Sequence, residues 1–136
     1  MRVFLDSSVI LSACGSKRSL SRLITVLAAE RSWNLVSAAY CRAETVKNLT
    51  KFAPQATAHW QDFHARIEWV PNAITTKRPL LLTASKDKPV LISALAAKCD
   101  TLLTLDTADF GIVLGTEVCG MTVATPRDFL VRAGLG

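Results

Sequence analysis

The sequence predicts an α/β fold: a single compact domain with a central, mainly parallel sheet flanked by helices. Strand-like and helix-like segments alternate along the chain. The strand-like segments are continuous apolar runs, which are typical of parallel strands buried on both faces. At 136 residues, half of them hydrophobic and 20% charged, the chain is large enough for one proper core. We therefore expect one domain over residues 1–136.

The first three elements follow from local patterns. Residues 2–5, "RVFL", predict a short buried strand, and residues 8–15 predict a helix that stops at a glycine. Residues 19–32 predict an amphipathic helix, because apolar residues recur at i, i+3 and i+4. These apolar positions are Leu20, Leu23, Ile24, Leu27 and Ala28.

The middle of the chain predicts a second strand and two more helices. Residues 33–37 read as the strand, and Ser37 is placed to cap a helix over residues 38–52. Pro54 opens a further helix that runs to about Arg66. One face of that helix is apolar and carries Ala56, Trp60, Phe63 and Ile67.

The last third predicts the remaining elements. Residues 67–70 read as a short strand, whereas residues 71–86 give no assignable pattern. Residues 87–99 predict a helix with a proline in its first turn, and residues 100–106 predict a strand that ends in an acid. Residues 125–134 predict a closing helix with threonine at its cap and glycine at its end.

Acidic residues stand near the ends of several predicted elements. Asp6 follows the first strand, Glu44 lies in the second turn of the helix after the second strand, and Asp87 heads the helix over 87–99. Asp106 and Asp109 follow the strand over 100–106. If the sheet is parallel, all of these lie at one edge of it, where α/β sheets bind ligands. Converging carboxylates repel one another unless cations lie between them, and their hard oxygens suit Mg²⁺ or Mn²⁺.

Taken one at a time, these acids also have structural interpretations. Asp6 and Asp109 fit turn residues, and Asp6 also fits a helix N-cap. Glu44 fits a surface partner of Lys47, three residues along the helix. Asp87 fits a helix cap, which is compatible with binding a metal. The order of the acids and their common edge favour a joint site.

The charge distribution favours a nucleic-acid substrate. The chain carries 16 basic and 11 acidic residues, so removing the five acids above leaves a charge of +10 on the rest. An acidic pocket in a basic surface suits a metal-dependent nuclease, because cationic side chains bind the phosphate backbone. The basic clusters near the predicted rim are Lys17, Arg18, Arg22, Arg42, Lys47, Lys51, Lys77, Arg78, Lys86 and Lys88. An ordinary solvated surface would also account for any one of these clusters.

These motifs together resemble the PIN domain family, and in particular its VapC-like toxin–antitoxin ribonucleases. The resemblance rests on "VFLDSSVILSA", on the helix carrying Glu44, on "KDKPVLISALAAKCDTLLTLDTADF" and on the order of the acids. It spans nearly the whole chain and is weakest over residues 54–85. It implies a compact α/β endoribonuclease that hydrolyses RNA with Mg²⁺ or Mn²⁺.

The resemblance also implies roles for individual residues. The catalytic and metal-binding acids would be Asp6, Glu44, Asp87 and Asp106. Ser7, Ser8 and Thr104 would orient ligands and water, and Asp109 matches a more variable acidic position. Members of the family frequently have asparagine where this chain has Ser8. The implied partners are an RNA substrate, an antitoxin protein and a second copy of the chain in a homodimer.

Two other functions are compatible with the same features. A haloacid-dehalogenase-like phosphatase also has an aspartate after its first strand, but it needs a second acid at the position of Ser8. A PIN-fold module that binds RNA or protein with a vestigial metal site stays open. No apolar run reaches the roughly 18 residues that span a membrane, so we expect a cytoplasmic protein with no membrane partner.

The cysteines, histidines and aromatic residues fit packing roles better than catalytic or ligand-binding roles. The cysteines lack a Cys-x-x-Cys spacing, which indicates buried structural thiols over a disulfide or metal site. They are Cys14, Cys41, Cys99 and Cys119. His59 and His64 are five residues apart and share a helix face poorly. Trp60, Phe63 and Trp69 fit core or dimer contacts better than base-stacking positions.

Overall fold

A six-stranded sheet forms the centre of the molecule, in a computed structural model that describes residues 1–51, 55–73 and 88–135. The strand order is β3-β2-β1-β4-β6-β5, and every neighbouring pair is parallel except β5 and β6. The strands are β1 (Arg2–Leu5), β2 (Asn34–Ala38), β3 (Glu68–Val70), β4 (Thr101–Leu103), β5 (Glu117–Val118) and β6 (Met121–Ala124). The predicted α/β fold with a mainly parallel sheet is confirmed.

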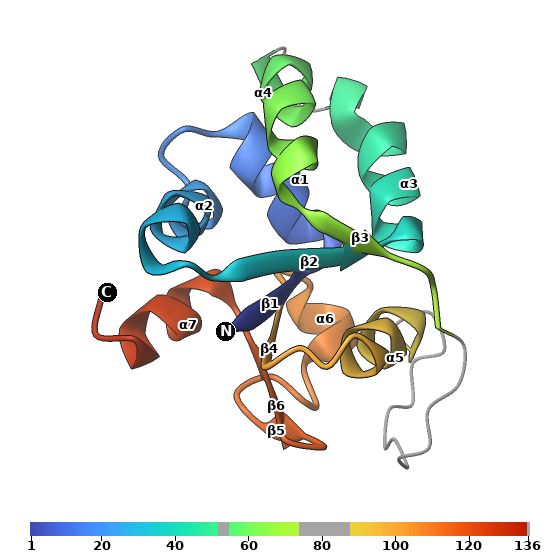
Figure 1. Ribbon diagram of the computed structural model, residues 1–136, viewed down its shortest axis with the longest axis vertical. Helices are drawn as coiled ribbons and strands as arrows, with labels where there is room; N and C mark the ends of the chain where they lie inside the picture. The colour runs from blue at the N-terminus through green and yellow to red at the C-terminus, as the bar shows by residue number, and fades with distance from the viewer. Residues whose placement is uncertain (52–54, 74–87, 136) are drawn as a thin grey trace.

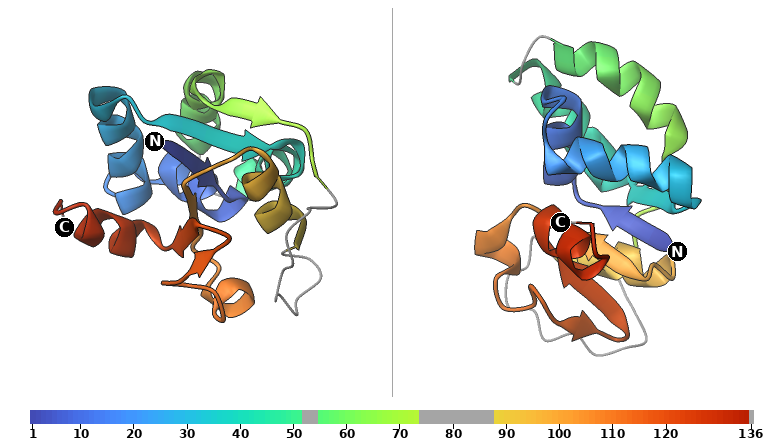
Figure 2. Two further views of the ribbon diagram at one scale, coloured as in Figure 1. Left: turned by 60° about the horizontal axis from the view of Figure 1, so that its bottom comes forward. Right: turned by 90° about the vertical axis from the view of Figure 1, so that its left-hand side faces the viewer.

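Helices cover both faces of this sheet. They are α1 (Ser7–Gly15), α2 (Leu20–Arg31), α3 (Ala39–Asn48), α4 (Gln55–Phe63), α5 (Lys88–Ala96), α6 (Thr107–Phe110) and α7 (Pro126–Arg132). Short 3-10 turns, Leu49–Lys51 and His64–Arg66, follow α3 and α4. Figure 1 shows α1 to α4 on one side of β2, with α5 and α6 on the other side. Figure 2 shows the same layers from two further directions, with α7 and the C-terminus beside α2.

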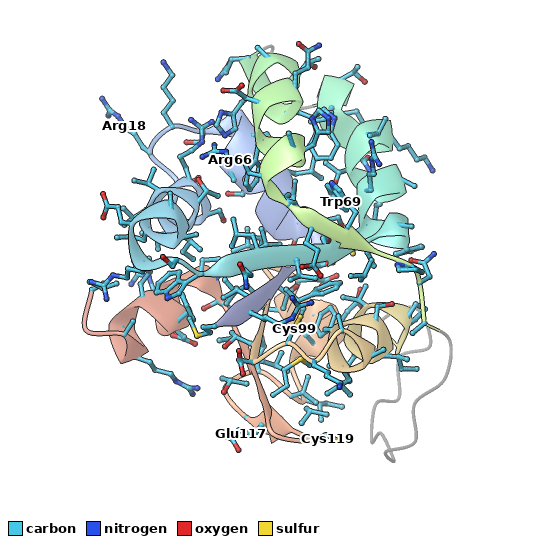
Figure 3. All side chains as sticks on the ribbon, in the orientation of Figure 1. Arg18, Arg66, Trp69, Cys99, Glu117 and Cys119 are labelled. Carbon is cyan, nitrogen blue, oxygen red and sulfur yellow. The ribbon has the colours of Figure 1, made fainter. Side chains whose placement is uncertain are left out.

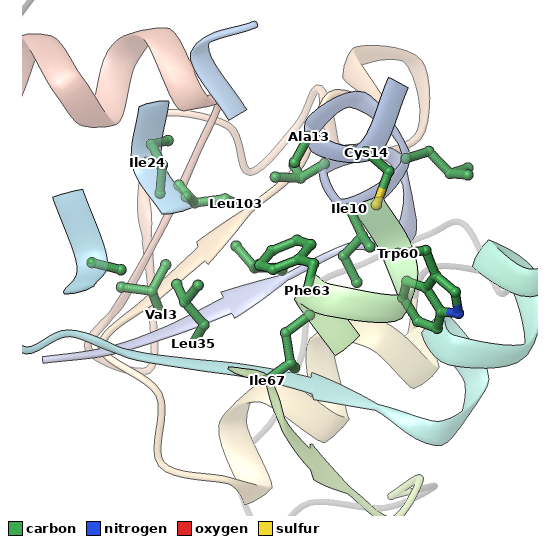
Figure 4. Packing of buried hydrophobic residues seen from close by; sticks show 14 of the residues in the cluster. Val3, Ile10, Ala13, Cys14, Ile24, Leu35, Trp60, Phe63, Ile67 and Leu103 are labelled. Atoms are coloured by element: carbon green, nitrogen blue, oxygen red, sulfur yellow. The ribbon is translucent and has the colours of Figure 1, made fainter. Parts of the chain in front are cut away.

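Two apolar clusters fix these layers, one on each face. On the first face, α1, α2 and α4 bury residues against β1 and β2, with Phe63 of α4 fully buried beside Ile10 of α1 (Figure 4). On the second face, Leu91 of α5 and Phe110 of α6 pack against Phe4 of β1. Full burial of a side chain of this size stabilises the fold by roughly 1.5–3 kcal/mol. The strand ends are therefore held in place from both sides.

Most predicted elements are confirmed, with bounds that differ by a few residues. Helix α2 begins after Ser19, whose hydroxyl accepts from the Arg22 N–H, and Thr125 caps α7 in the same way. The apolar face expected on α4 is buried at Ala56, Trp60 and Phe63. The predicted strand over 100–106 is shorter, because Asp106 instead caps α6. The sequence did not predict the β5–β6 hairpin, whose turn carries Cys119 (Figure 3).

The predicted helix cap at Ser37 is wrong. Ser37 is fully buried in β2, and its hydroxyl donates to the Leu5 carbonyl of β1 at 2.7 Å. The N-cap position of α3 is Ala38, which has no capping side chain. The Asn72 amide oxygen, from the segment after β3, accepts from the Tyr40 N–H at 2.7 Å and serves this helix end. The proline at position 54 and the unassigned residues 74–86 lie outside the described residues.

Burial was expected for all four cysteines and is found for three of them. All four cysteines are described, and none of them forms a disulfide. Cys14, Cys41 and Cys99 are buried, whereas Cys119 is half-exposed. Within the described residues, the structure contains no helix that is both long and apolar enough to cross a membrane.

Candidate functional site

A pocket of about 430 Å³ opens beyond the carboxyl ends of the central strands. Three separate elements bring acids to it: Asp6 from the end of β1, Glu44 from α3, and Asp106 and Asp109 from the segment after β4. This is the edge at which parallel sheets bind ligands, because the strands stop there and the helices that follow diverge. The pocket is lined by Asp6, Ser7, Ser8, Leu11, Tyr40, Glu44, Asn48, Lys51, Val90, Asp106, Asp109 and Phe110.

Asp6 is the most buried of these acids, with only 7% of the residue exposed. Two hydroxyls donate to the same carboxylate oxygen, Oδ2: Thr104 at 2.8 Å and Ser8 at 2.9 Å. A buried carboxylate needs such donors, because a charge removed from water without partners is very unfavourable. The two hydroxyls therefore hold Asp6 in one orientation at the floor of the pocket.

The same two hydroxyls also hold the segment after β4. Ser8 accepts from the Leu105 N–H at 3.0 Å, and Thr104 accepts from the Asp106 N–H at 3.0 Å. Asp6 and Asp106 are 100 residues apart in sequence, yet each is one hydrogen bond away from Thr104. Ser8 and Thr104 therefore determine the position of one acid relative to the other.

The environment of Asp6 opposes its ionisation. Burial raises the pKa of Asp6 above its ordinary value, and the nearby charge of Asp106 acts in the same direction. The hydrogen bonds from Thr104 and Ser8 lower the pKa but do not cancel the effect of burial. Perturbed carboxyl groups of this kind gather at functional sites, where burial and nearby charges shift their pKa.

The other acids differ from Asp6 in their contacts. Glu44 is half-buried, and its carboxylate makes no hydrogen bond or ion pair with another described side chain. The alternative interpretation of Glu44 as a surface partner of Lys47 is therefore not supported among the described residues. Asp106 accepts from the Asp109 N–H at 3.0 Å and so begins α6. Asp109 lies in the first turn of that helix and lines the same pocket.

Part of the pocket wall was not predicted from the sequence. Tyr40, Asn48 and Lys51 also line the pocket. The sequence contains a signal for two of them, because Tyr40 and Asn48 are each four residues from Glu44 and residues four apart lie on one helix face. Several basic residues were expected near the rim of the pocket. Among those that the structure describes, Lys51 lines it. Arg18 and Arg66 lie on the side of the sheet covered by α1, α2 and α4 (Figure 3).

The donor set has the chemistry of a hard-cation site. Carboxylates and hydroxyls line the pocket, and such oxygen ligands suit Mg²⁺ or Mn²⁺. In the part of the chain that the structure describes, no three His, Cys, Asp or Glu side chains are placed so that they could hold a metal by themselves. Asp87, the remaining predicted ligand, lies outside the described residues. His59 and His64 do not line the pocket; His64 stacks on Trp60.

Comparisons with known proteins identify the family and the fold of this chain. Residues 2–108 match the family model described as PIN domain. Among solved structures, the chain is similar to one from the crystal structure of VapBC2 from Rickettsia felis, bound to a DNA fragment from its promoter. The TM-score is 0.63 at 13% identity, covering 90% of this chain and 97% of that one. No curated protein sequence matches.

Proposed function

The chain belongs to the PIN domain family, and from that premise we propose that it is an endoribonuclease that depends on Mg²⁺ or Mn²⁺. The observation that carries the proposal is the pocket to which three separate elements bring Asp6, Glu44 and Asp106. These acids, together with Asp87, would hold the metal. The vestigial-module alternative gains no support from the pocket, because each of the three described acids is retained there.

The residues of the pocket have separable tasks in phosphodiester hydrolysis. When bound, a divalent ion lowers the pKa of a coordinated water and offsets charge on the leaving oxygen. Asp6, oriented by Thr104 and Ser8, presents a carboxylate whose burial makes it a strong partner for a cation. Glu44 faces the pocket with its carboxylate uncommitted to any described side chain. Asp106 is fixed by its capping bond, so its position depends on the fold of the α6 turn.

The experiment is cleavage of a mixed RNA pool by the purified protein with Mn²⁺ or Mg²⁺, with and without a chelator. Asp6→Asn, Glu44→Gln, Asp87→Asn and Asp106→Asn are assayed beside the wild type. Asp128→Asn is the matched control, because Asp128 is exposed on α7 and does not line the pocket. We expect the four site variants and the chelator to abolish cleavage, and the control to retain it.

Metal binding gives a readout that does not require the correct RNA. A ligand that binds only the folded state at 100 times its Kd stabilises it by about 2.7 kcal/mol, so Mn²⁺ should raise the Tm of the wild type. The Asp6→Asn variant should lose most of this increase. If neither ion changes the Tm and no RNA is cleaved by the folded protein, the nuclease proposal fails. That result would favour the alternative, a module that binds RNA or protein with a vestigial metal site.

We further propose that the chain is the toxin component of a toxin–antitoxin pair and forms a homodimer. The support is its similarity to a chain of the VapBC2 complex. Expression of the wild type, but not of Asp6→Asn, should arrest growth, and co-expression of the product of an adjacent gene should restore it. Light scattering of the purified protein tests the dimer. Growth that is unaffected by active nuclease would argue against the toxin role.

A further inference from the structure

Asp6 and Glu44 are held in the pocket in different ways. Two hydroxyls donate directly to the carboxylate of Asp6. The carboxylate of Glu44 makes no hydrogen bond or ion pair with another described side chain, so its position depends on where α3 lies. Glu44 is one helical turn after Tyr40, about 6 Å along the axis of α3. The contacts that hold the first turn of α3 therefore determine where Glu44 enters the pocket.

The first turn of α3 is capped by a residue from another part of the chain. The first N–H groups of a helix have no partner within the helix, and the side chain of the residue before it often supplies one. Here that residue is Ala38, which has no capping side chain. The amide oxygen of Asn72 instead accepts from the Tyr40 N–H at 2.7 Å, across 32 residues of sequence. The start of α3 is therefore coupled to the segment after β3.

A second contact joins α3 to β3 next to this cap. The guanidinium carbon of Arg42, in α3, lies 5.5 Å from the centre of the Trp69 ring, in β3. Such a cation–π contact is attractive. The Trp69 ring is itself held in place, because its indole N–H donates to the His64 carbonyl at 2.9 Å. β3 and the residues after it therefore contact the first turn of α3 at two positions.

The segment after β3 is also attached to α5. The Ala73 N–H donates to the Ser93 hydroxyl at 3.1 Å, and Ser93 is only 1% exposed. Because Asn72 and Ala73 are adjacent, one short segment is bonded both to α3 and to α5, and Figure 1 shows the chain passing from β3 alongside α3 towards α5. Helix α5 begins at Lys88, directly after Asp87 in the sequence. The segment therefore links the helix that carries one proposed metal ligand to the helix that follows another.

We propose that Asn72 is a positioning residue of the metal site, which holds Glu44 in place by capping α3. Asn72 itself does not line the pocket, so it acts through the helix. The inference rests on the proposed metal-dependent ribonuclease function and adds a residue to it. If the capped helix binds the cation more tightly than the uncapped one, a bound cation must strengthen the cap by the same factor. The coupling can therefore be measured in the unaltered protein.

The amide of Tyr40 reports on the cap. Tyr40 is the only tyrosine, so protein labelled with ¹⁵N-tyrosine gives a single backbone amide resonance. We expect Mg²⁺ to slow hydrogen exchange of this amide about 2- to 30-fold, the range that corresponds to one helix cap. Unchanged exchange would overturn the inference.

The control amide is that of Asp128, followed in uniformly labelled protein. It donates to Thr125 Oγ1 at the start of α7, a helix whose residues do not line the pocket. Its exchange should not respond to Mg²⁺. Equal slowing at Tyr40 and Asp128 would also overturn the inference, because Mg²⁺ would then stabilise the whole fold and not the start of α3.

Variants of the cap test the same coupling through metal affinity. Asn72→Ala should weaken Mn²⁺ binding, measured by calorimetry, about 2- to 30-fold. Asn72→Asp retains an acceptor oxygen at the same place and should bind Mn²⁺ at least as tightly as the wild type. The matched control is Thr125→Ala, which removes the side-chain cap of α7 and should lower the Tm without changing the Kd for Mn²⁺. Equal losses of affinity in Asn72→Ala and Thr125→Ala would mean that any loss of stability weakens the site.

A double-mutant cycle tests whether Asn72 acts through Glu44. In a Glu44→Gln background, studied at higher Mn²⁺ concentration, Asn72→Ala should change the Kd little, because the ligand that it positions is already lost. Ser93→Ala loosens the same segment, so it should weaken Mn²⁺ binding by itself and add little to Asn72→Ala. Losses of affinity that add fully in either pair would overturn the inference.

The outcomes separate this inference from the ribonuclease proposal. If the wild type binds neither Mn²⁺ nor Mg²⁺ and cleaves no RNA, the ribonuclease proposal itself fails. If the wild type binds Mn²⁺ and Asn72→Ala binds it with the same Kd, only the inference about Asn72 fails.

Discussion

Substitution of Thr104 by valine tests how the pocket is held together. Thr104 is fully buried at the end of β4. Its hydroxyl donates to Asp6 Oδ2 at 2.8 Å and accepts from the Asp106 N–H at 3.0 Å. Valine keeps the shape of threonine and removes both bonds. The change therefore isolates the hydroxyl from the packing around it.

The expected loss follows from the two bonds. A hydrogen bond to a charged group contributes about 1.5–3 kcal/mol, and a neutral one about 0.5–1.5 kcal/mol. Water can replace part of the hydrogen bond from the Asp106 N–H, because Asp106 is half-exposed. The methyl group of valine offsets up to about 0.8 kcal/mol of the lost stability. We expect Thr104→Val to lower the free energy of unfolding by about 2–3 kcal/mol, which corresponds to a decrease in Tm of roughly 6–12 °C.

The assay is urea unfolding in chelator at pH 7, with Thr25→Val as the matched control. Thr25 is also buried, but its hydroxyl donates only to the Arg22 carbonyl within α2, so its loss should cost less than about 1 kcal/mol. The Thr104 bond lowers the pKa of Asp6 and is strongest to the ionised form. The effect of Thr104→Val should therefore shrink as acid protonates Asp6. Equal losses in the two variants at pH 7 would refute this account of the pocket.

Three further predictions address the rest of the molecule. Burial, together with the charges of Arg22 and Arg66, lowers the pKa of His59, and its Nε2 has no hydrogen-bond partner among the described residues. The unfolded chain therefore binds a proton more readily, so this contribution to stability is complete above pH 6.5 and is lost as pH falls through the folded pKa. Urea unfolding between pH 7.5 and 5.5 should show a smaller decline for His59→Phe than for the wild type, and equal declines would contradict the assignment. Burial raises the pKa of Cys14 and Cys99 to about 11 and that of Cys41 to about 12, so a thiol reagent at pH 8 should label only Cys119 rapidly in the native protein. Mass spectrometry of the labelled peptides checks this, and rapid labelling of a buried thiol would show that the core opens. Asn72→Ala removes the acceptor for the Tyr40 N–H and should lower the free energy of unfolding by about 1 kcal/mol in a urea titration. No change would mean that water serves this helix end equally well.

The sequence by itself determined the order and kind of most elements. Local patterns were sufficient wherever a helix has its own cap or face, as at Ser19, at Thr125 and on the buried side of α4. They also placed Asp6 and Asp106 each near the end of a strand, because acids that interrupt apolar runs mark where a buried strand stops. That these two strands are neighbours followed only from the pairing of β1 with β4. The hairpin of β5 and β6 was missed because strands of two and four residues carry too little periodicity to be recognised.

Tertiary structure alone decided which partners the polar groups found. Ser37 suits a helix cap by its local sequence, but the pairing of β1 with β2 places it beside the Leu5 carbonyl, and Asn72 serves the helix instead. The hydroxyls of Ser8 and Thr104 meet on one oxygen of Asp6 only because parallel pairing brings β1 and β4 together. Such contacts join residues far apart in sequence, and a buried polar group takes whichever partner the packed fold supplies.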